Sequence, residues 1–174
     1  MSLTVLLGGA RAGKSALALE LAQEGDVPVV YIATAEAGDD EMAARIAQHR
    51  AERPEAWRTV EEPVALRSVL ASIEPAACVV VDCLTLWVAN LLARGDDVLP
   101  EAEAVAELAA GRSGPTIVVS NEVGLGIVPA SPVAREYRDL LGAVNAAFVR
   151  RAEDAAFVVS GCAIPLQPGW RPRA

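Results

Sequence analysis

Lysine, histidine, cysteine and aromatic residues are all scarce in this 174-residue chain. There is one lysine, one histidine and three cysteines, and aromatic residues make up 4%. The cysteines, Cys78, Cys83 and Cys162, match no zinc-site spacing, so we expect reduced, buried thiols in a cytoplasmic protein. No apolar run approaches the length of a membrane span, and the N-terminus lacks a signal-peptide pattern, which argues against a membrane or secreted protein.

Net charge and composition limit the partners that this protein can bind and the kind of chain it can be. The net charge is -8, so we expect neither nucleic acid nor an anionic membrane as a partner. Apolar residues make up 53% and charged residues 22%, a balance that excludes a disordered chain. The length suits a single domain over residues 1–174, and we expect a loose tail at about 167–174.

Short apolar segments alternate with longer stretches of helical periodicity. The expected strands are Leu3–Leu7, Val29–Ala33, Cys78–Asp82, Thr116–Ser120 and Ala156–Ser160. The expected helices are Lys14–Glu24, Asp39–Arg53, Pro63–Ile73, Leu84–Arg94, Pro100–Gly111 and Pro132–Asp154, three of which begin at a proline. This alternation predicts an α/β protein with three layers, a mostly parallel sheet with helices on both faces.

The only lysine lies in a glycine-rich segment between the first expected strand and helix. The run Gly8-Gly9-Ala10-Arg11-Ala12-Gly13-Lys14-Ser15 matches the phosphate-loop (P-loop) pattern G-x-x-x-x-G-K-[ST]. Glycines let backbone N–H groups surround phosphate oxygens, Lys14 reaches the β- and γ-phosphates, and Ser15 can hold Mg²⁺. A chance match is the alternative, but the strand–loop–helix context favours a P-loop (RecA-like) fold that binds a nucleoside triphosphate.

A second metal ligand is expected at the end of a neighbouring strand. Asp82 follows three valines and is the candidate partner of Ser15 for Mg²⁺. The alternative is that Asp82 caps the helix that follows. The guanine-reading N-K-x-D pattern of regulatory GTPases requires a second lysine, which the chain lacks. Small-molecule P-loop kinases and RecA-like ATPases remain open.

The single histidine lies on an expected helix between two arginines. Arg45, His49 and Arg53 are spaced four residues apart and therefore line one stripe of that helix. Arginines there can clamp phosphates, and an imidazole beside them is a candidate nucleophile. A solvated, charged helix face with an incidental histidine is the alternative that spacing alone leaves open.

Longer blocks of the sequence extend the analysis beyond the P-loop. They are Gly8–Ser15, Tyr31–Thr34, Asp40–Ile46, His49–Pro54 with Trp57 and Thr59, Glu61–Pro63, Asp82–Trp87, Ser120–Pro129, Arg135, Arg138-Asp139, Gly142 and Asn145. From Gly8 to about Gly161, these blocks resemble one enzyme family, the bifunctional adenosylcobinamide kinase/adenosylcobinamide-phosphate guanylyltransferases of cobalamin biosynthesis. The run Asn121-Glu122-Val123-Gly124-Leu125-Gly126-Ile127-Val128-Pro129 is the most specific of them. The loop departs from the family only at Ala12, where a serine is usual.

The resemblance implies two successive reactions. ATP or GTP phosphorylates adenosylcobinamide, and GTP then transfers GMP to that phosphate to give adenosylcobinamide-GDP. The family's covalent histidine–GMP intermediate maps onto His49, with Lys14 as the other catalytic residue. The resemblance also implies a homotrimer. Nucleotide contacts are implied at Gly8, Gly9, Ala10, Arg11, Ala12, Gly13, Lys14, Ser15, Thr34, Ala35, Glu36, Arg50, Ala51, Glu52, Arg53, Glu61 and Asp82, with Ser15 and Asp82 as the metal ligands.

Two other functions stay open as alternatives. One is a monofunctional small-molecule P-loop kinase in which His49 is inert, and the other is a RecA-like ATPase whose hydrolysis drives motion. Exposed apolar positions on Pro132–Asp154 could serve a subunit interface or could equally belong to the core.

Overall fold

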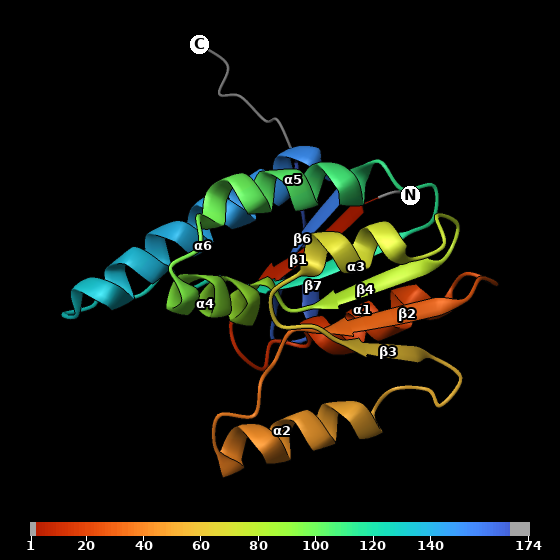
Figure 1. The fold of residues 1–174 in the computed structure, drawn as a ribbon, viewed down its shortest axis with the longest axis horizontal. Coiled ribbons are helices and arrows are strands. Elements are labelled where there is room, and N and C mark those ends of the chain that lie inside the picture. The colour runs from red at the N-terminus through yellow and green to blue at the C-terminus, as the bar shows by residue number, and fades with distance from the viewer. Residues whose placement is uncertain (1–2, 168–174) are drawn as a thin grey trace.

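The computed structural model describes residues 3–167, which form a twisted sheet flanked by helices (Figure 1). The strands are β1 (Leu3–Gly8), β2 (Val29–Ala33), β3 (Arg58–Glu61), β4 (Cys78–Asp82), β5 (Thr116–Asn121), β6 (Asp154–Val159) and β7 (Cys162–Leu166). The helices are α1 (Lys14–Gln23), α2 (Asp40–Ala51), α3 (Leu66–Ser72), α4 (Leu84–Arg94), α5 (Val98–Ala110) and α6 (Pro132–Arg151).

The sheet order brings distant strand ends together at one edge. The order is β3-β2-β4-β5-β1-β6-β7, and every pairing is parallel except that of β7 with β6. Gly8 at the end of β1 pairs with Asn121 at the end of β5, and Asp82 ends β4 beside them. Because parallel strands end at the same edge, the loops that follow them form a common site. The mostly parallel α/β sheet predicted from the sequence is confirmed.

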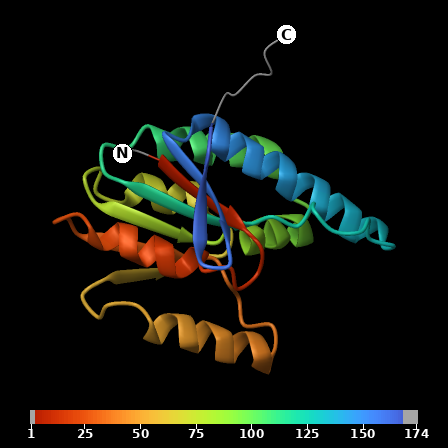
Figure 2. The same cartoon turned by 180° about the vertical axis from the view of Figure 1, so that it is seen from behind.

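Helices cover both faces of this sheet, as predicted. Helices α3, α4, α5 and α6 pack over one face, and α1 packs over the other (Figures 1 and 2). The buried strands supply both apolar layers by alternation: Val79 and Val81 of β4 join the first, while Cys78 and Val80 join the second. Trp87 of α4 is fully buried in the larger layer.

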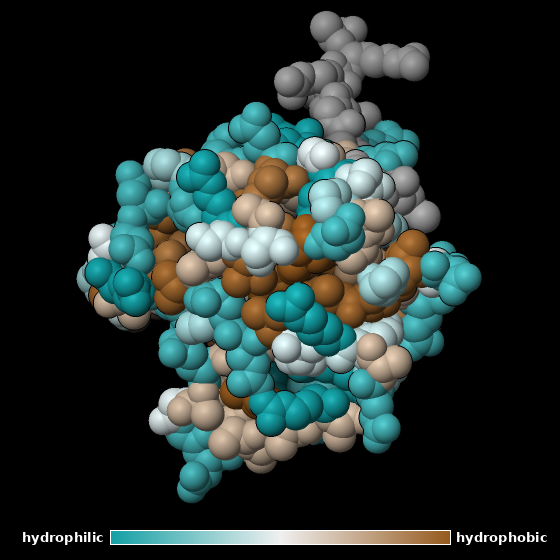
Figure 3. All heavy atoms as spheres, turned by 45° about the vertical axis from the view of Figure 1, so that its right-hand side comes forward, coloured by the Kyte–Doolittle hydropathy of each residue, from teal (hydrophilic) through white to brown (hydrophobic). Residues whose placement is uncertain are grey.

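Helix α2 differs from the other helices because none of its residues is buried. Asp39 caps its N-terminus by accepting a hydrogen bond from the Met42 amide. The helix lies below β3 and away from the apolar layers in Figure 1, and hydrophilic and intermediate side chains line that lower edge in Figure 3. Its least exposed side chains, Met42, Ile46 and His49, are only half-buried, so α2 contributes no residue to the core.

Several expected boundaries were wrong, each for a local reason. The helix expected from Pro63 begins at Leu66, because the Glu62 carboxylate accepts from the Val64 and Ala65 amides and holds a turn first. The helix expected from Pro100 begins at Val98, since proline is tolerated in a first turn whose N–H groups lack helical partners.

The C-terminal part of the sheet also differs from the expectation. The helix expected to reach Asp154 ends at Arg151, because the Glu153 amide bonds to the Leu3 carbonyl and starts the pairing with β1. The strand expected at Ala156–Ser160 is therefore Asp154–Val159. Strands β3 and β7 were not expected at all. Apart from Gln167, the predicted loose tail at about 167–174 lies outside the described residues.

Two other sequence expectations are now decided. All three cysteines are free, as predicted, but only Cys78 is buried, whereas Cys162 is exposed on β7. On α6, Leu141, Val144 and Phe148 belong to the core, whereas Val133 is 64% exposed.

A pair of glycine substitutions tests the contact between β1 and β6. A Cβ at Gly8, whose φ is +152°, would lie 2.1 Å from the Val158 carbonyl oxygen, whereas a Cβ at Gly142 on α6 would meet nothing within 4 Å. We expect Gly8→Ala to lower the free energy of unfolding by about 2 kcal/mol or more. Gly142→Ala should raise it by about 0.5–1 kcal/mol. Urea denaturation followed by circular dichroism measures both; equal stability of the two variants would contradict the packing.

Candidate active site

The loop between β1 and α1 wraps around the side chain of Lys14. The ammonium group donates hydrogen bonds to the Gly8 carbonyl at 3.0 Å and the Gly9 carbonyl at 2.6 Å. Burial lowers the pKa of Lys14 from its ordinary value. Gly13 closes the loop at a φ of +102°, a left-handed conformation that favours glycine. The chain thus adopts the strand–loop–helix arrangement that the motif requires.

The turn between β6 and β7 supports this loop from the side. The Gly161 amide donates to the Ala12 carbonyl at 3.0 Å, and a Cβ on Gly13 would lie 3.5 Å from the Gly161 Cα. The backbone carbonyl of Ala12 therefore helps to hold the loop in place.

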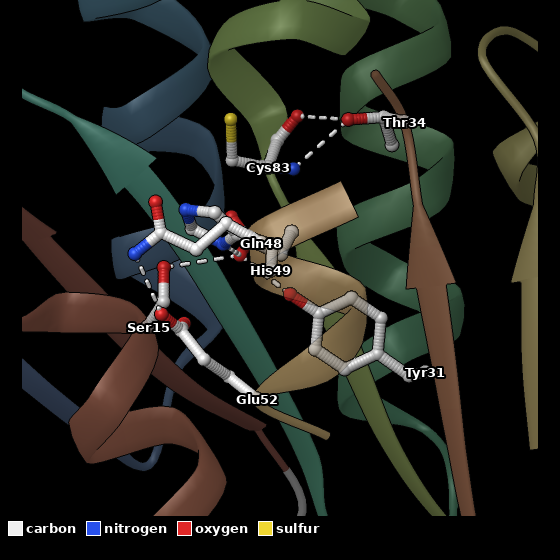
Figure 4. A network of polar contacts seen from close by, with 8 residues as sticks. Ser15, Tyr31, Thr34, Gln48, His49, Glu52 and Cys83 are labelled. Atoms are coloured by element: carbon white, nitrogen blue, oxygen red, sulfur yellow. Dashed lines mark hydrogen bonds and ion pairs between the residues drawn. The ribbon is translucent and has the colours of Figure 1, made fainter. Parts of the chain in front are cut away.

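Several polar side chains of the site contact the carboxylate of Asp82. Its Oδ2 accepts hydrogen bonds from the Ser15 hydroxyl at 3.0 Å and the Tyr31 hydroxyl at 2.6 Å. Figure 4 shows Ser15 and Tyr31 directing their hydroxyl groups toward the position where His49 also lies. The structure thus brings the predicted metal ligands Ser15 and Asp82 together. The capping alternative is wrong, because the N-cap of α4 is Cys83.

His49 faces the same carboxylate from α2. Its Nδ1 lies 3.8 Å from Asp82 Oδ2, and its side chain is 30% exposed. The His49 imidazole thus points from α2 into the cavity that the phosphate loop lines, although part of it is exposed to solvent. That position does not fit a merely solvated helix face.

Two adjoining cavities meet at His49. The larger, about 490 Å³, is lined by the loop from Arg11 to Ala16, by Glu41, Ala44, Arg45, Gln48 and His49 of α2, and by Asp82, Cys83, Val119 and Asn121. The smaller, about 60 Å³, lies between β2 and α2 and includes Tyr31, Ala35 and Arg53. Arg45, His49, Asp82 and Cys83 line both. Cations from Arg11, Lys14 and Arg45 give an anionic ligand favourable contacts in the larger cavity.

Among the other side chains that line both cavities, Cys83 could in principle compete with His49 as a nucleophile. Burial, and then the charge of Asp82, raise the pKa of the Cys83 thiol to about 11. The thiol therefore stays protonated near neutral pH, and the thiolate is the reactive form. This leaves the imidazole of His49 as the stronger candidate.

The other predicted nucleotide contacts differ in their surroundings. Thr34 is buried, and its hydroxyl donates to the Cys83 carbonyl and accepts from the Cys83 amide (Figure 4), so it braces the site. Arg50 and Glu61 form an exposed ion pair beside α2. Nine of the predicted nucleotide contacts line neither cavity: Gly8, Gly9, Ala10, Thr34, Glu36, Arg50, Ala51, Glu52 and Glu61.

Sequence reasoning missed several residues of the site. Tyr31, Gln48, Cys83 and Asn121 contribute to the cavities although none was proposed as a site residue. Asn121 was detectable because it directly follows the predicted strand Thr116–Ser120, at the end where the glycine loop also lies. Tyr31 lies inside a buried strand, where an aromatic residue is ordinary core, so its only signal in the sequence is that Tyr31–Thr34 is one of the blocks carrying the family resemblance.

Comparison with known proteins assigns the chain to a family. A family model described as cobinamide kinase / cobinamide phosphate guanyltransferase matches residues 4–166. The chain belongs to this family. It is 49% identical over 166 residues to the bifunctional adenosylcobalamin biosynthesis protein CobP of Pseudomonas aeruginosa, covering 94% of this chain and 96% of that protein. It is 41% identical over 179 residues to CobU of Escherichia coli, named likewise, with coverage of 94% and 98%.

Solved structures with low identity support the fold of this cobinamide kinase / guanyltransferase family member. The chain is similar to the RadB recombinase, with a TM-score of 0.52, 19% identity and coverage of 90% of this chain and 73% of that one. It is also similar to a type III secretion system ATPase, with a TM-score of 0.53, 11% identity and coverage of 90% and 50%. The predicted P-loop, RecA-like fold is thereby confirmed. Within residues 3–167, no helix has the length and apolar character of a membrane span.

The two tyrosines allow a spectroscopic test of the site and the core. Burial raises the pKa of Tyr137 to about 12, and burial together with Asp82 raises that of Tyr31 further. Because the folded pKa values exceed the unfolded value of about 10, the associated stabilisation is complete below that pH and is lost as pH rises through the folded values. We expect almost no phenolate absorbance at 295 nm at pH 10.5 while circular dichroism shows a folded protein, and ionisation of about three-quarters of the tyrosine at the same pH in denaturant. Ionisation of one tyrosine near pH 10 in the folded protein would contradict this burial.

Proposed function

We propose that this enzyme catalyses both reactions of its family, first phosphorylating adenosylcobinamide with ATP or GTP and then transferring GMP from GTP to the product. The observation that carries the proposal is that His49 lines the same cavity as Lys14 and Ser15. A kinase alone needs the loop and Asp82. A nucleophile facing that loop adds the means for a second, covalent transfer.

In the first reaction the loop residues position the triphosphate. Backbone amides of the loop and the Lys14 ammonium contact the phosphate oxygens, where negative charge builds up during transfer. The substrate hydroxyl oxygen attacks the γ-phosphorus, the bond to the β–γ bridging oxygen breaks, and the hydroxyl proton passes to solvent water. The nucleoside diphosphate leaves.

In the second reaction His49 carries the nucleotide. An imidazole nitrogen attacks the α-phosphorus of GTP, an N–P bond forms, and the bond to the α–β bridging oxygen breaks to release pyrophosphate. An oxygen of the substrate phosphate then attacks that phosphorus, and the N–P bond breaks with its electron pair returning to the imidazole. Since Nδ1 faces Asp82, we assign the attack to Nε2.

The donor set of the site suits Mg²⁺. The Ser15 hydroxyl and the Asp82 carboxylate are hard oxygen ligands 3.0 Å apart, and Mg²⁺ in nucleotide sites takes one or two protein ligands and completes its shell with phosphates and water. The described residues contain no group of three or more His, Cys, Asp or Glu that could hold a metal by itself. We propose that Ser15 and Asp82 hold the ion, which would neutralise charge on the phosphates.

The second, smaller cavity suggests how one site serves two transfers. The γ-phosphorus must face the hydroxyl of cobinamide in one reaction, and the α-phosphorus must face His49 in the other. Ala35 and Arg53, both implied as nucleotide contacts, line the smaller cavity, to which no residue of the phosphate loop contributes. We propose that the nucleoside of GTP lies toward this cavity during guanylyl transfer. The exposed Arg50–Glu61 pair stands near the same end of α2 and offers polar groups to the base.

Labelling of the protein by nucleotide tests the covalent step. Wild type incubated with Mg²⁺ and GTP labelled on the α-phosphate should retain label after denaturation, in an acid-labile and alkali-stable form. His49→Ala should lose essentially all of it, because the chain has no other histidine. GTP labelled on the γ-phosphate is the control and should leave no label.

The kinase reaction provides the internal control for folding. His49→Ala should still transfer γ-phosphate to cobinamide at a rate within about tenfold of wild type, since the loop and Asp82 are intact. An unlabelled wild type that binds GTP would instead favour the monofunctional kinase with an inert His49.

The homotrimer implied by the family resemblance stays a proposal, and an exposed apolar segment supports it. The residues between β5 and α6 include Leu125, Ile127 and Val128, which are 80%, 98% and 62% exposed. They lead into the start of α6, which projects beyond the sheet in Figures 1 and 2. Large exposed apolar side chains in sequence are typical of association surfaces. We propose that this segment packs against a neighbouring copy and that adenosylcobinamide binds between subunits.

Light scattering after gel filtration tests this interface. Wild type should have the mass of three chains, and Ile127→Asp should dissociate at micromolar concentration because it buries a charge in an apolar contact. Val27→Asp, at a 36% exposed position before β2, is the matched control and should remain trimeric. A single-chain mass for wild type would refute the trimer, and a trimeric Ile127→Asp would place the interface elsewhere.

The cytoplasmic location expected from the sequence also stays a prediction. The free thiols of all three cysteines are compatible with a reducing compartment.

A further inference from the structure

Tyr31 contacts both Asp82 and Arg53, through different parts of its side chain. It is 2% exposed on β2, and its hydroxyl donates to Asp82 Oδ2 at 2.6 Å. Its ring lies beneath Arg53, whose guanidinium carbon is 3.8 Å from the ring centroid. The hydroxyl thus contacts the end of β4, while the ring contacts the residue that follows α2 by two positions.

The ring contact matters because α2 has few other means of attachment. No residue of Asp40–Ala51 is buried, and the Arg50–Glu61 ion pair beside it is exposed on both sides. Exposed ion pairs stabilise little, whereas a cation over a buried aromatic face is less screened by water. Arg53 Nε is itself buried without a hydrogen-bond partner, and the guanidinium carbon lies over the Tyr31 ring.

The hydroxyl contact matters because Asp82 Oδ2 faces three groups at once. Ser15, Tyr31 and Nδ1 of His49 all approach this one oxygen. A carboxylate can rotate about its bond to Cβ, and a buried phenol that donates to one oxygen fixes that rotation. The direction in which Asp82 presents Oδ2 to His49 therefore depends on a residue that does not line the larger cavity.

We propose that Tyr31 is a positioning residue for guanylyl transfer, which fixes the Asp82 carboxylate through its hydroxyl and holds the end of α2 through its ring, so that His49 stays against Asp82. The proposal rests on the function proposed for His49 and goes beyond it. The ring and the hydroxyl have separable tasks. Losing the ring releases α2, and losing only the hydroxyl frees Asp82 while α2 stays docked.

Two substitutions separate these tasks. In Tyr31→Phe the ring still supports Arg53, so hydrogen–deuterium exchange of the α2 amides should match wild type, while the single-turnover rate of His49 labelling by α-labelled GTP falls about tenfold. In Tyr31→Leu the exchange of α2 should increase severalfold and labelling should fall about a hundredfold. Transfer of γ-phosphate to cobinamide should fall in both variants by a similar, smaller factor, since it uses Asp82 but not α2.

Tyr137→Phe is the matched control. Tyr137 is the other tyrosine, on α6, where its hydroxyl donates to the Thr85 carbonyl at 3.0 Å, away from α2. This variant should leave both α2 exchange and His49 labelling at the wild-type level. Thermal unfolding of each variant, followed on the core helices, shows whether an effect is local.

The outcomes distinguish this proposal from the function on which it rests. If wild type shows no His49 label, the proposed guanylyl transfer fails, and faster α2 exchange in Tyr31→Leu alone would still support the docking role. If wild type is labelled but Tyr31→Leu labels at the wild-type rate with unchanged α2 exchange, the positioning role is overturned. A loss of labelling in Tyr31→Leu that is matched by an equal loss of kinase activity would also overturn it, because the effect would then be general.

Discussion

The carboxylate of Asp82 is the interaction on which the rest of this site depends. A single oxygen accepts hydrogen bonds from the Ser15 hydroxyl in the first turn of α1 and from the Tyr31 phenol of β2, and it faces the His49 imidazole of α2. Among the described residues, no other side-chain atom makes polar contacts with α1, β2 and α2 together. The sheet makes the arrangement possible, because the loops that follow parallel strands all begin at the same end of the sheet, where the carboxyl ends of the strands lie. Asp82 ends β4 at that edge, next to the glycine loop that follows β1.

The two halves of the site are held by different kinds of interaction. The phosphate loop is fixed by the sheet itself, through the close approach of β1 to β6 and the Gly161 amide on Ala12. Helix α2 has no apolar face in the core and is attached through polar and aromatic contacts. A rigid loop suits a triphosphate that must bind in a defined position. A helix attached by a few contacts suits a nucleophile that acts in only one of two reactions, since its position is decided by few groups.

Much of the architecture was predictable because it rests on local patterns. The glycine loop, the buried strands β1, β2, β4 and β5, and the starts of α1, α4 and α6 follow from composition and periodicity over a few residues. Strand β3 escaped prediction because Arg58–Glu61 is short, mostly exposed and at the sheet edge, so it carries no run of apolar residues. Strand β7 escaped prediction because it contains Pro165, which lacks an N–H group. Proline is tolerated there because β7 is an edge strand that pairs with β6 alone. Pro63 and Pro100 misplaced two helix starts because proline marks a first turn without fixing its first residue.

The sequence by itself determined the phosphate loop, the nucleophile candidate and the α/β class, because each depends on residue types at short spacing. It could pair Ser15 with Asp82, since strand ends and helix starts have known positions in a parallel sheet. Only the tertiary structure decided that His49 faces Asp82 and that Arg53 lies on the ring of Tyr31. These contacts join α2 to strands from which it is separated by loops, and no periodicity encodes which way such a helix turns. Its orientation is set by contacts that form only once the sheet has assembled, among them half-buried Met42 and Ile46 and the Arg53–Tyr31 pair.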